Sequence, residues 1–326
     1  MRHVSIALAL VAALAVAGCG GSDSDDRPPE PAPKPTARAQ DFPSAKGKTL
    51  ETLRDGLSKG PNLEPTMTTL SVGTNRMGFV LRDDANKMIN GADLAIYTTD
   101  HDGTNARGPY VARTESLEVK TNFRAQNSDS GDVKSIYVAE VPIRRAGKPV
   151  ITGVARLDGR VVATTGFEIP VPKKGTKGRP PDVGDPAIEV HTPTITSVGG
   201  DATKISTRVP PAEPMLQDDL ADVLGQKPVV LAFATPQLCA SRICGPVVDV
   251  AMQVQADYGD EVAFIQQEIY KDNSVANGFT DQVATWRLPT EPWIFVIDRE
   301  GIVRHRFEGA MSVGELQRAV ADVTQV

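Results

Sequence analysis

The spacing of apolar residues changes once along this chain of 326 residues. Between residues 66 and 171, short segments alternate apolar with polar residues, and turn sequences such as DHDGTN and LDGR separate them at intervals of about ten residues. After residue 227, apolar strand-like runs are followed by segments in which apolar residues recur every third or fourth position. A strand buries alternate residues and a helix buries one stripe, so the two patterns predict an all-β domain followed by an α/β domain.

The alternating segments predict an antiparallel β-sandwich over residues 61–172. The segments are TTLSVGT, RMGFVLRD, ADLAIYTT, SIYVAEVPI, PVITGVARL and VVATTGFEIPV. This pattern resembles the Ig-like domains of bacterial surface proteins, although the region has no cysteine for an inter-sheet disulfide. His101 and the scattered aspartates form no cluster, and we interpret them as solvated loop residues rather than as copper or calcium ligands.

The N-terminus has the pattern of an export signal. Arg2 is followed by an uncharged run over residues 4–18, which is too short to span a bilayer as a mature helix. The end of this run, Val16-Ala17-Gly18-Cys19, resembles the lipobox of bacterial lipoproteins. The resemblance implies cleavage after residue 18, lipid on Cys19, and a protein held at the extracytoplasmic side of a cell membrane. The alternative is a plain secretory signal with a chance cysteine.

Two further segments have the composition of connections. Within residues 19–60, the stretch GGSDSDDRPPEPAPKPTARA at 20–39 has too few large apolar residues to form a core, so we expect a disordered tether over 19–60. Residues 173–185 lie in the Pro- and Gly-rich stretch VPKKGTKGRPPDVGDPA and are expected to link the two domains. The formal net charge of −6 argues against a nucleic-acid partner, which would require a basic face.

The remaining residues, 186–326, contain a regular series of predicted elements. The expected elements are a buried strand at 228–234, a helix from 246, a strand at 261–269, a helix at 279–288, a hairpin formed by 293–298 and 302–309, and a helix at 313–323. Both remaining cysteines, Cys239 and Cys244, fall between the first strand and the first helix.

This order of elements, together with FAT…C…CGP and the proline before WIFVIDREG, resembles the thioredoxin fold, nearest to the extracytoplasmic redoxins. The resemblance implies a thiol–disulfide oxidoreductase that acts on the thiols or disulfides of partner proteins and uses no cofactor or metal. It covers about residues 186–326.

The spacing of the cysteines departs from the Cys-x-x-Cys of thioredoxins, because four residues separate Cys239 from Cys244. Aligning Cys244-Gly-Pro with the thioredoxin motif would place the second cysteine at Val247, which has no thiol. We therefore favour Cys239 as the attacking thiol and Cys244 as the resolving thiol at the helix start. A helix N-terminus stabilises a thiolate, and Arg242 between the cysteines is expected to lower a thiol pKa further.

In this fold a cis-proline faces the cysteine pair. Similar redoxins have it six residues before the aspartate of the hairpin, which selects Pro292 before Asp298. Pro289, which is followed by threonine as in thioredoxin, is the second choice.

Two other functions remain open from the sequence, and a third, copper binding, is rejected. A structural disulfide on a redoxin scaffold would make the protein a non-enzymatic surface binding module. A thiol peroxidase is less favoured, because Pro236 stands where peroxiredoxins have threonine and Thr235 is one position too early. Copper-binding relatives require a histidine before the late strand; residues 270–295 contain none, and His305 is expected to be an exposed strand residue.

Overall fold

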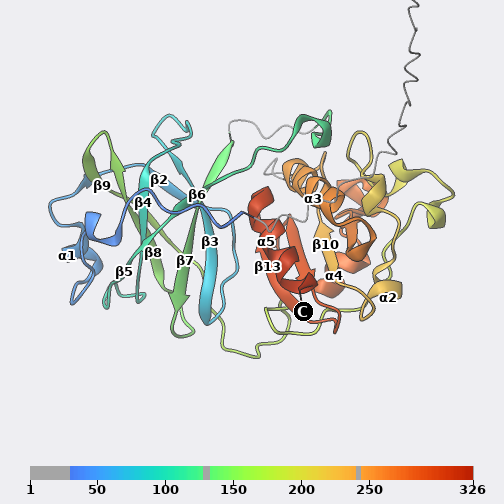
Figure 1. The fold of residues 1–326 in the computed structure, drawn as a ribbon. Coiled ribbons are helices and arrows are strands. Elements are labelled where there is room, and N and C mark those ends of the chain that lie inside the picture. The colour runs from blue at the N-terminus through green and yellow to red at the C-terminus, as the bar shows by residue number, and fades with distance from the viewer. Residues whose placement is uncertain (1–29, 128–132, 240–243, 326) are drawn as a thin grey trace, which may run out of the picture.

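The computed structural model describes residues 30–127, 133–239 and 244–325. A β-sandwich and an α/β unit lie side by side, and the strand β13 (Val303–Glu308) and the helix α5 (Val313–Thr324) of the α/β unit lie next to the sandwich (Figure 1). Cys19 and Arg242, two of the residues singled out in the sequence, lie outside the described residues. Within the described residues no helix is long and apolar enough to cross a bilayer.

The sandwich consists of two sheets. The five-stranded sheet has the order β1-β9-β8-β4-β5 and the four-stranded sheet the order β2-β3-β7-β6. The strands are β1 (Ser58–Lys59), β2 (Asn62–Pro65), β3 (Gly73–Arg82), β4 (Asp93–Thr99), β5 (Arg107–Val111), β6 (Arg113–Ser116), β7 (Ser135–Ile143), β8 (Val150–Leu157) and β9 (Arg160–Glu168). β1 pairs with β9 in parallel, and the other neighbouring strands pair antiparallel.

Alternate residues of the strands form the core between the two sheets. Met77 and Phe79 of β3 pack there with Leu94 and Ile96 of β4 and with Ile151 of β8. The predicted segments at 76–83, 92–99, 135–143, 149–157 and 161–171 coincide with β3, β4, β7, β8 and β9. The period-two pattern therefore identified these strands because each of them buries one face.

The strand predicted at residues 68–74 is wrong, because β3 begins only at Gly73. The backbone N–H groups of Thr68 and Thr69 donate to the carboxylate of Glu308 in the α/β unit instead of to a neighbouring strand. Tertiary contact with the second unit thus replaces the sheet hydrogen bonds that the sequence pattern suggested.

The tether predicted to reach residue 60 is also wrong in its second half. η1 (Ala39–Asp41) and α1 (Leu50–Arg54) follow residue 36, and Ala37, Phe42, Ala45 and Leu53 are buried. They cover the outer face of the five-stranded sheet at Ala95, Tyr97 and Val154. Likewise, the predicted linker at 173–185 packs against the protein, because Pro180 and Pro181 are buried. Both segments have a polar composition, but in each a few apolar residues are buried against the rest of the protein.

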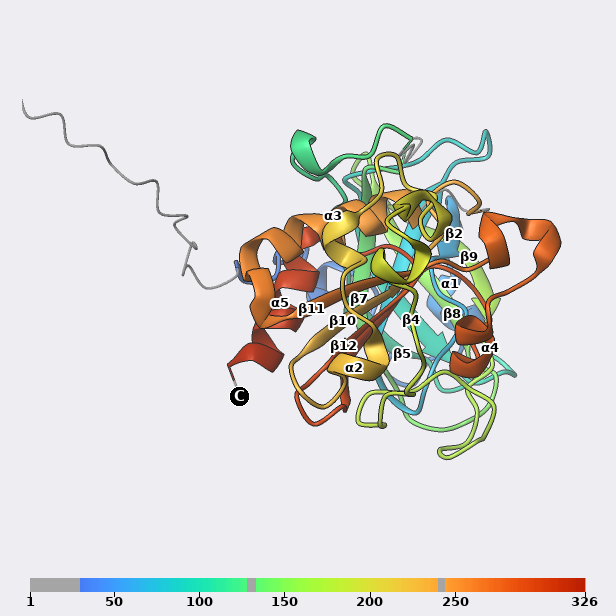
Figure 2. The ribbon, with the colours of Figure 1, turned by 90° about the vertical axis from the view of Figure 1, so that its right-hand side faces the viewer.

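The α/β unit is built on a four-stranded sheet of order β11-β10-β12-β13 (Figure 2). β10 (Val229–Phe233) and β11 (Ala263–Gln267) are parallel, whereas β12 (Trp293–Ile297) is antiparallel to β10 and to β13 (Val303–Glu308). The helices are α2 (Leu220–Val223), α3 (Cys244–Tyr258), α4 (Asp281–Trp286) and α5 (Val313–Thr324). The remaining 3-10 helices are η2 (Thr121–Phe123), η3 (Thr196–Val198), η4 (Ala202–Lys204), η5 (Glu213–Met215), η6 (Gly259–Glu261), η7 (Lys271–Asn273) and η8 (Val275–Asn277).

Helices cover both faces of this sheet. Val230 and Ala232 of β10 pack with α3 and α5, whereas Leu231 and Phe233 pack with α4 on the opposite face. The predicted strands and helices of residues 228–323 coincide with the observed ones to within a few residues at their ends. The cysteine segment therefore lies at the corner between the central strand β10 and the helix α3.

The outer face of the four-stranded sheet packs against the α/β unit. Val80, Ile136 and Val138 form one apolar cluster with Ala310, which precedes α5. Next to this cluster, the buried carboxylate of Glu315 lies 2.7 Å from Arg76 and 3.0 Å from Arg113, both from the sandwich. Burial alone would raise the pKa of Glu315, but the two arginines outweigh burial and lower that pKa. The two units are thus joined by both apolar and ionic contacts.

Candidate redox site

The structure brings Cys239 and Cys244 together. Cys239 ends the segment that follows β10, and Cys244 is the first residue of α3. Both side chains are buried in the apolar cluster between the sheet and α3, and a hydrogen bond joins the two thiols. The wider Cys-x4-Cys loop therefore still permits contact between the two sulfur atoms.

The two cysteines differ in their surroundings. Burial raises the pKa of the Cys244 thiol well above its ordinary value, and the hydrogen bond to Cys239 and the negative charge of that residue raise it further. The backbone N–H of Thr235 donates to Cys244 and opposes this rise. Cys244 therefore holds its proton more tightly than an ordinary thiol, as expected of a resolving thiol that must stay protonated until the partner has reacted.

The residue before Pro292 lies close enough to Cys244 for its charge to act on the thiol. The Glu291–Pro292 peptide bond is cis, and the bond before Pro289 is not. The negative charge of Glu291 acts on Cys244 and raises its pKa, so this loop lies beside the pair. The same charge, together with those of both cysteines, acts on Tyr270, whose pKa is raised mainly by burial.

Sequence reasoning missed a buried carboxylate next to this site. Glu268 follows β11 and is only 4% exposed. Its Oε1 accepts hydrogen bonds from the backbone N–H of Thr207 at 2.6 Å and from the Thr207 hydroxyl at 2.9 Å. Burial raises the pKa of Glu268, whereas these bonds and the nearby Thr235 hydroxyl oppose the rise.

Glu268 and Thr235 each have one buried side-chain oxygen atom at this site. Within the described residues, neither Glu268 Oε2 nor Thr235 Oγ1 has a hydrogen bond of good geometry. The Thr235 side chain nevertheless lowers the pKa of Glu268, and the Thr235 backbone N–H donates to Cys244. Thr235 therefore lies between the buried carboxylate and the resolving thiol. The signal in the sequence was a glutamate three positions after the apolar run AFI, at the end of a predicted strand.

The β-sandwich also reaches the cysteine helix. Arg208 is buried and forms an ion pair at 3.0 Å with Asp249, a buried residue of α3. The loop between β6 and β7 joins this pair: the backbone N–H of Ala125 donates to Asp249, and that of Lys120 donates to Gln253. The helix that begins with Cys244 is therefore held by residues of both units.

Comparison with known proteins gives weak similarities. No family model matches the chain, and no curated protein matches it. A solution structure from Bacteroides thetaiotaomicron, provisionally described as a protein disulfide isomerase, is 14% identical, with a TM-score of 0.32 over 45% of this chain and 92% of that chain. A thioredoxin-family thiol:disulfide interchange protein from Chlorobium tepidum is 15% identical, with a TM-score of 0.30 over 46% of this chain and 99% of that chain.

The Lin-41 filamin domain is similar as well. It is 12% identical, with a TM-score of 0.17 over 40% of this chain and 97% of that chain. At these TM-scores, the proposals below rest on the geometry of this chain alone.

Proposed function

We propose that this chain is a thiol–disulfide oxidoreductase that acts on partner polypeptides through Cys239 and Cys244. The observation that carries the proposal is the hydrogen-bonded pair of thiols at the strand-to-helix corner, in which the Cys244 thiol is buried and has a raised pKa. The loop of Pro292 beside the pair supplies backbone against which an extended partner segment can lie.

In the reductive direction, the Cys239 thiolate attacks one sulfur of a partner disulfide. A bond forms between Cys239 and that sulfur, and the second partner sulfur leaves as a thiolate that takes up a proton. Cys244 then loses its proton and attacks Cys239, which releases the first partner sulfur and leaves a Cys239–Cys244 disulfide. The partner gains two electrons and the pair loses two; the reverse sequence oxidises a partner dithiol.

The proton of Cys244 needs an acceptor, because the thiol is buried and holds it tightly. Glu268 is the acceptor we propose, because Thr235 contacts both Cys244 and Glu268, and the raised pKa of Glu268 makes its carboxylate a stronger base than an exposed one. We assign to Glu268 the role of proton acceptor during release of the partner.

We further propose that the protein works at the extracytoplasmic side of a membrane, held by lipid on Cys19, with an Ig-like sandwich domain before the redox unit. The lipobox-like Val16-Ala17-Gly18-Cys19 supports this location. Disulfides persist in such compartments, so substrates for the pair would be available there.

The reduction potential of the Cys239–Cys244 pair tests the proposal. We expect thiol trapping of the protein in redox buffers to give about −120 to −270 mV, the range of exchange proteins. A potential below about −300 mV would instead indicate a structural disulfide. The protein would then be better described as a surface binding module.

Replacing Glu268 by glutamine should slow the release of partner from the mixed disulfide by about tenfold to a hundredfold, because the acceptor of the Cys244 proton is lost. Single-turnover mixing of the reduced protein with a disulfide peptide measures this step. The exposed Glu261→Gln provides the matched control. Equal release rates in the two variants would remove Glu268 from the mechanism.

The same variant should change the dependence of stability on pH. The pKa of Glu268 is raised in the folded protein, so above about pH 4.3 the unfolded chain loses this proton first and the stability of the wild type falls with rising pH. Glutamine does not titrate. The free energy of unfolding of Glu268→Gln should therefore increase relative to wild type as the pH rises, until the folded pKa is passed.

A further inference from the structure

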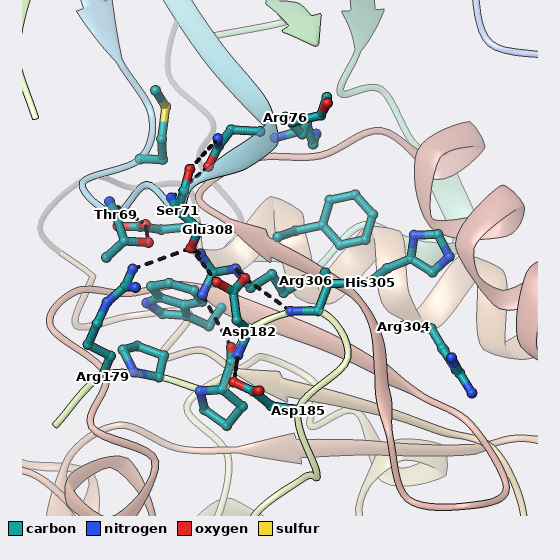
Figure 3. A pocket seen from close by; sticks show the side chains of 18 of the residues that line it. Thr69, Ser71, Arg76, Arg179, Asp182, Asp185, Arg304, His305, Arg306 and Glu308 are labelled. Atoms are coloured by element: carbon teal, nitrogen blue, oxygen red, sulfur yellow. Dashed lines mark hydrogen bonds and ion pairs between the residues drawn. The ribbon is translucent and has the colours of Figure 1, made fainter. Parts of the chain in front are cut away.

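Glu308, the last residue of β13, joins the two units of the protein. Its buried carboxylate accepts five hydrogen bonds, four of which come from the sandwich. The backbone N–H and hydroxyl of Thr68 donate to Oε1 at 2.8 and 2.6 Å, and those of Thr69 donate to Oε2 at 3.0 and 2.7 Å. Figure 3 shows Thr69 next to Glu308 at the wall of a cavity of about 1080 Å³ that is lined by both units.

The fifth hydrogen bond connects Glu308 to the loop of Pro292. The hydroxyl of Thr290 donates to Glu308 Oε1 at 2.7 Å and accepts from the indole N–H of Trp293 at 3.2 Å. On the other side of the loop, the backbone N–H of Gly309 donates to the carbonyl of Pro292 at 2.9 Å. The segment from Thr290 to Pro292 is therefore hydrogen-bonded to Glu308 at its first residue and to Gly309 at its last.

The sandwich lies in direct contact with this support. A Cβ atom at Gly309 would be 2.1 Å from the carbonyl oxygen of Thr66, so the two backbones already touch there. The segment 66–69 thus packs along the end of β13 with no room between them. Thr68 and Thr69 precede Glu308 by 240 and 239 residues in the chain. The position of the Pro292 loop therefore depends on residues that are distant in the sequence.

We propose that Glu308 is a positioning residue, through which Thr68 and Thr69 of the β-sandwich hold the Pro292 loop in place for a partner polypeptide. This inference rests on the proposed function. Without the threonine donors, the buried carboxylate would lose hydrogen bonds that compensate for its burial, and its contact with Thr290 would no longer be fixed. Binding of an extended polypeptide along the loop should suffer, whereas the reactivity of the thiols, which lie beyond the loop, should not.

The test compares Thr69→Val, which removes the hydroxyl, with Thr69→Ser, which retains it. Thr74→Val makes the same chemical change on an exposed threonine of β3. Insulin, reduced at the expense of dithiothreitol, is the polypeptide probe, and glutathione disulfide is the small probe. We expect Thr69→Val to raise the KM for insulin by about fivefold to tenfold, with kcat and the glutathione rate within about twofold of wild type.

Thr69→Ser and Thr74→Val should both retain the wild-type KM. An unchanged KM in Thr69→Val would overturn the inference, and so would equal losses with insulin and with glutathione disulfide, because a general loss of structure would affect both probes. If Thr69→Val does not fold, Glu308→Gln, which retains acceptors on one oxygen, is measured in the same way and must show the same selective rise in KM. A wild-type protein that reacts with neither probe would contradict the proposed function instead.

Discussion

Replacing Cys239 by serine should reduce disulfide exchange to the uncatalysed rate, whereas replacing Cys244 by serine should stop the reaction halfway. The first change removes the attacking thiolate, and a serine hydroxyl does not ionise at neutral pH to take its place. The second change leaves the attack intact but removes the thiol that releases the partner. Cys244→Ser should therefore accumulate a covalent complex with a disulfide-containing polypeptide, visible by electrophoresis without reductant.

The double variant, which lacks both thiols, is the control for complexes formed by other routes. Accumulation of the complex in Cys239→Ser instead of in Cys244→Ser would mean that the two roles are exchanged. If neither single variant forms a complex and both lose stability, the pair is structural. The raised pKa of Cys244 and its position as the first residue of α3 favour the roles proposed here.

Replacing Gly309 by alanine should lower the free energy of unfolding by about 3–5 kcal/mol. Two costs combine at this position. The φ angle of +80° disfavours any residue with a Cβ atom, and that atom would meet the backbone oxygen of Thr66 at 2.1 Å. Backbone cannot move aside as a flexible side chain can, so the contact between the sandwich and β13 must open.

Gly175→Ala separates the two costs. Its φ of +77° is nearly the same, but a Cβ atom there would meet nothing within 4 Å. We expect Gly175→Ala to cost only about 1–2 kcal/mol in urea unfolding. Equal losses in the two variants would show that the segment around Thr66 does not pack closely on Gly309.

Much of the α/β unit could be predicted from the sequence. The run from Val229 to Phe233 is apolar on every residue because helices cover both faces of the sheet, and that pattern is local. The corner that carries Cys239 and Cys244 could be located for the same reason, since a strand, two cysteines and a helix follow one another directly. Pro292 could be selected by counting back from the hairpin aspartate, Asp298.

The residues that support the site could not be predicted. Glu268 and Glu308 are ordinary glutamates at the ends of strands, and their burial depends on Thr207 and on Thr68 and Thr69, which lie far from them in the chain. β5 (Arg107–Val111) and β6 (Arg113–Ser116) were missed because few of their side chains are buried, which leaves little period-two signal. Such elements are specified by pairing with neighbouring strands and not by their own composition.

If Cys19 carries lipid, as we propose, the packing of residues 37–54 on the outer sheet face limits the distance between the redox site and the membrane. With lipid on Cys19 and a free chain up to residue 60, the connecting segment would measure up to about 150 Å when fully extended. Because Ala37 already packs on the sheet, only 18 residues would separate the folded unit from the lipid, and that segment would measure at most about 65 Å. The enzyme we propose would therefore serve a thin layer next to the bilayer, and its substrates would be proteins that are themselves embedded in, attached to or emerging from that membrane.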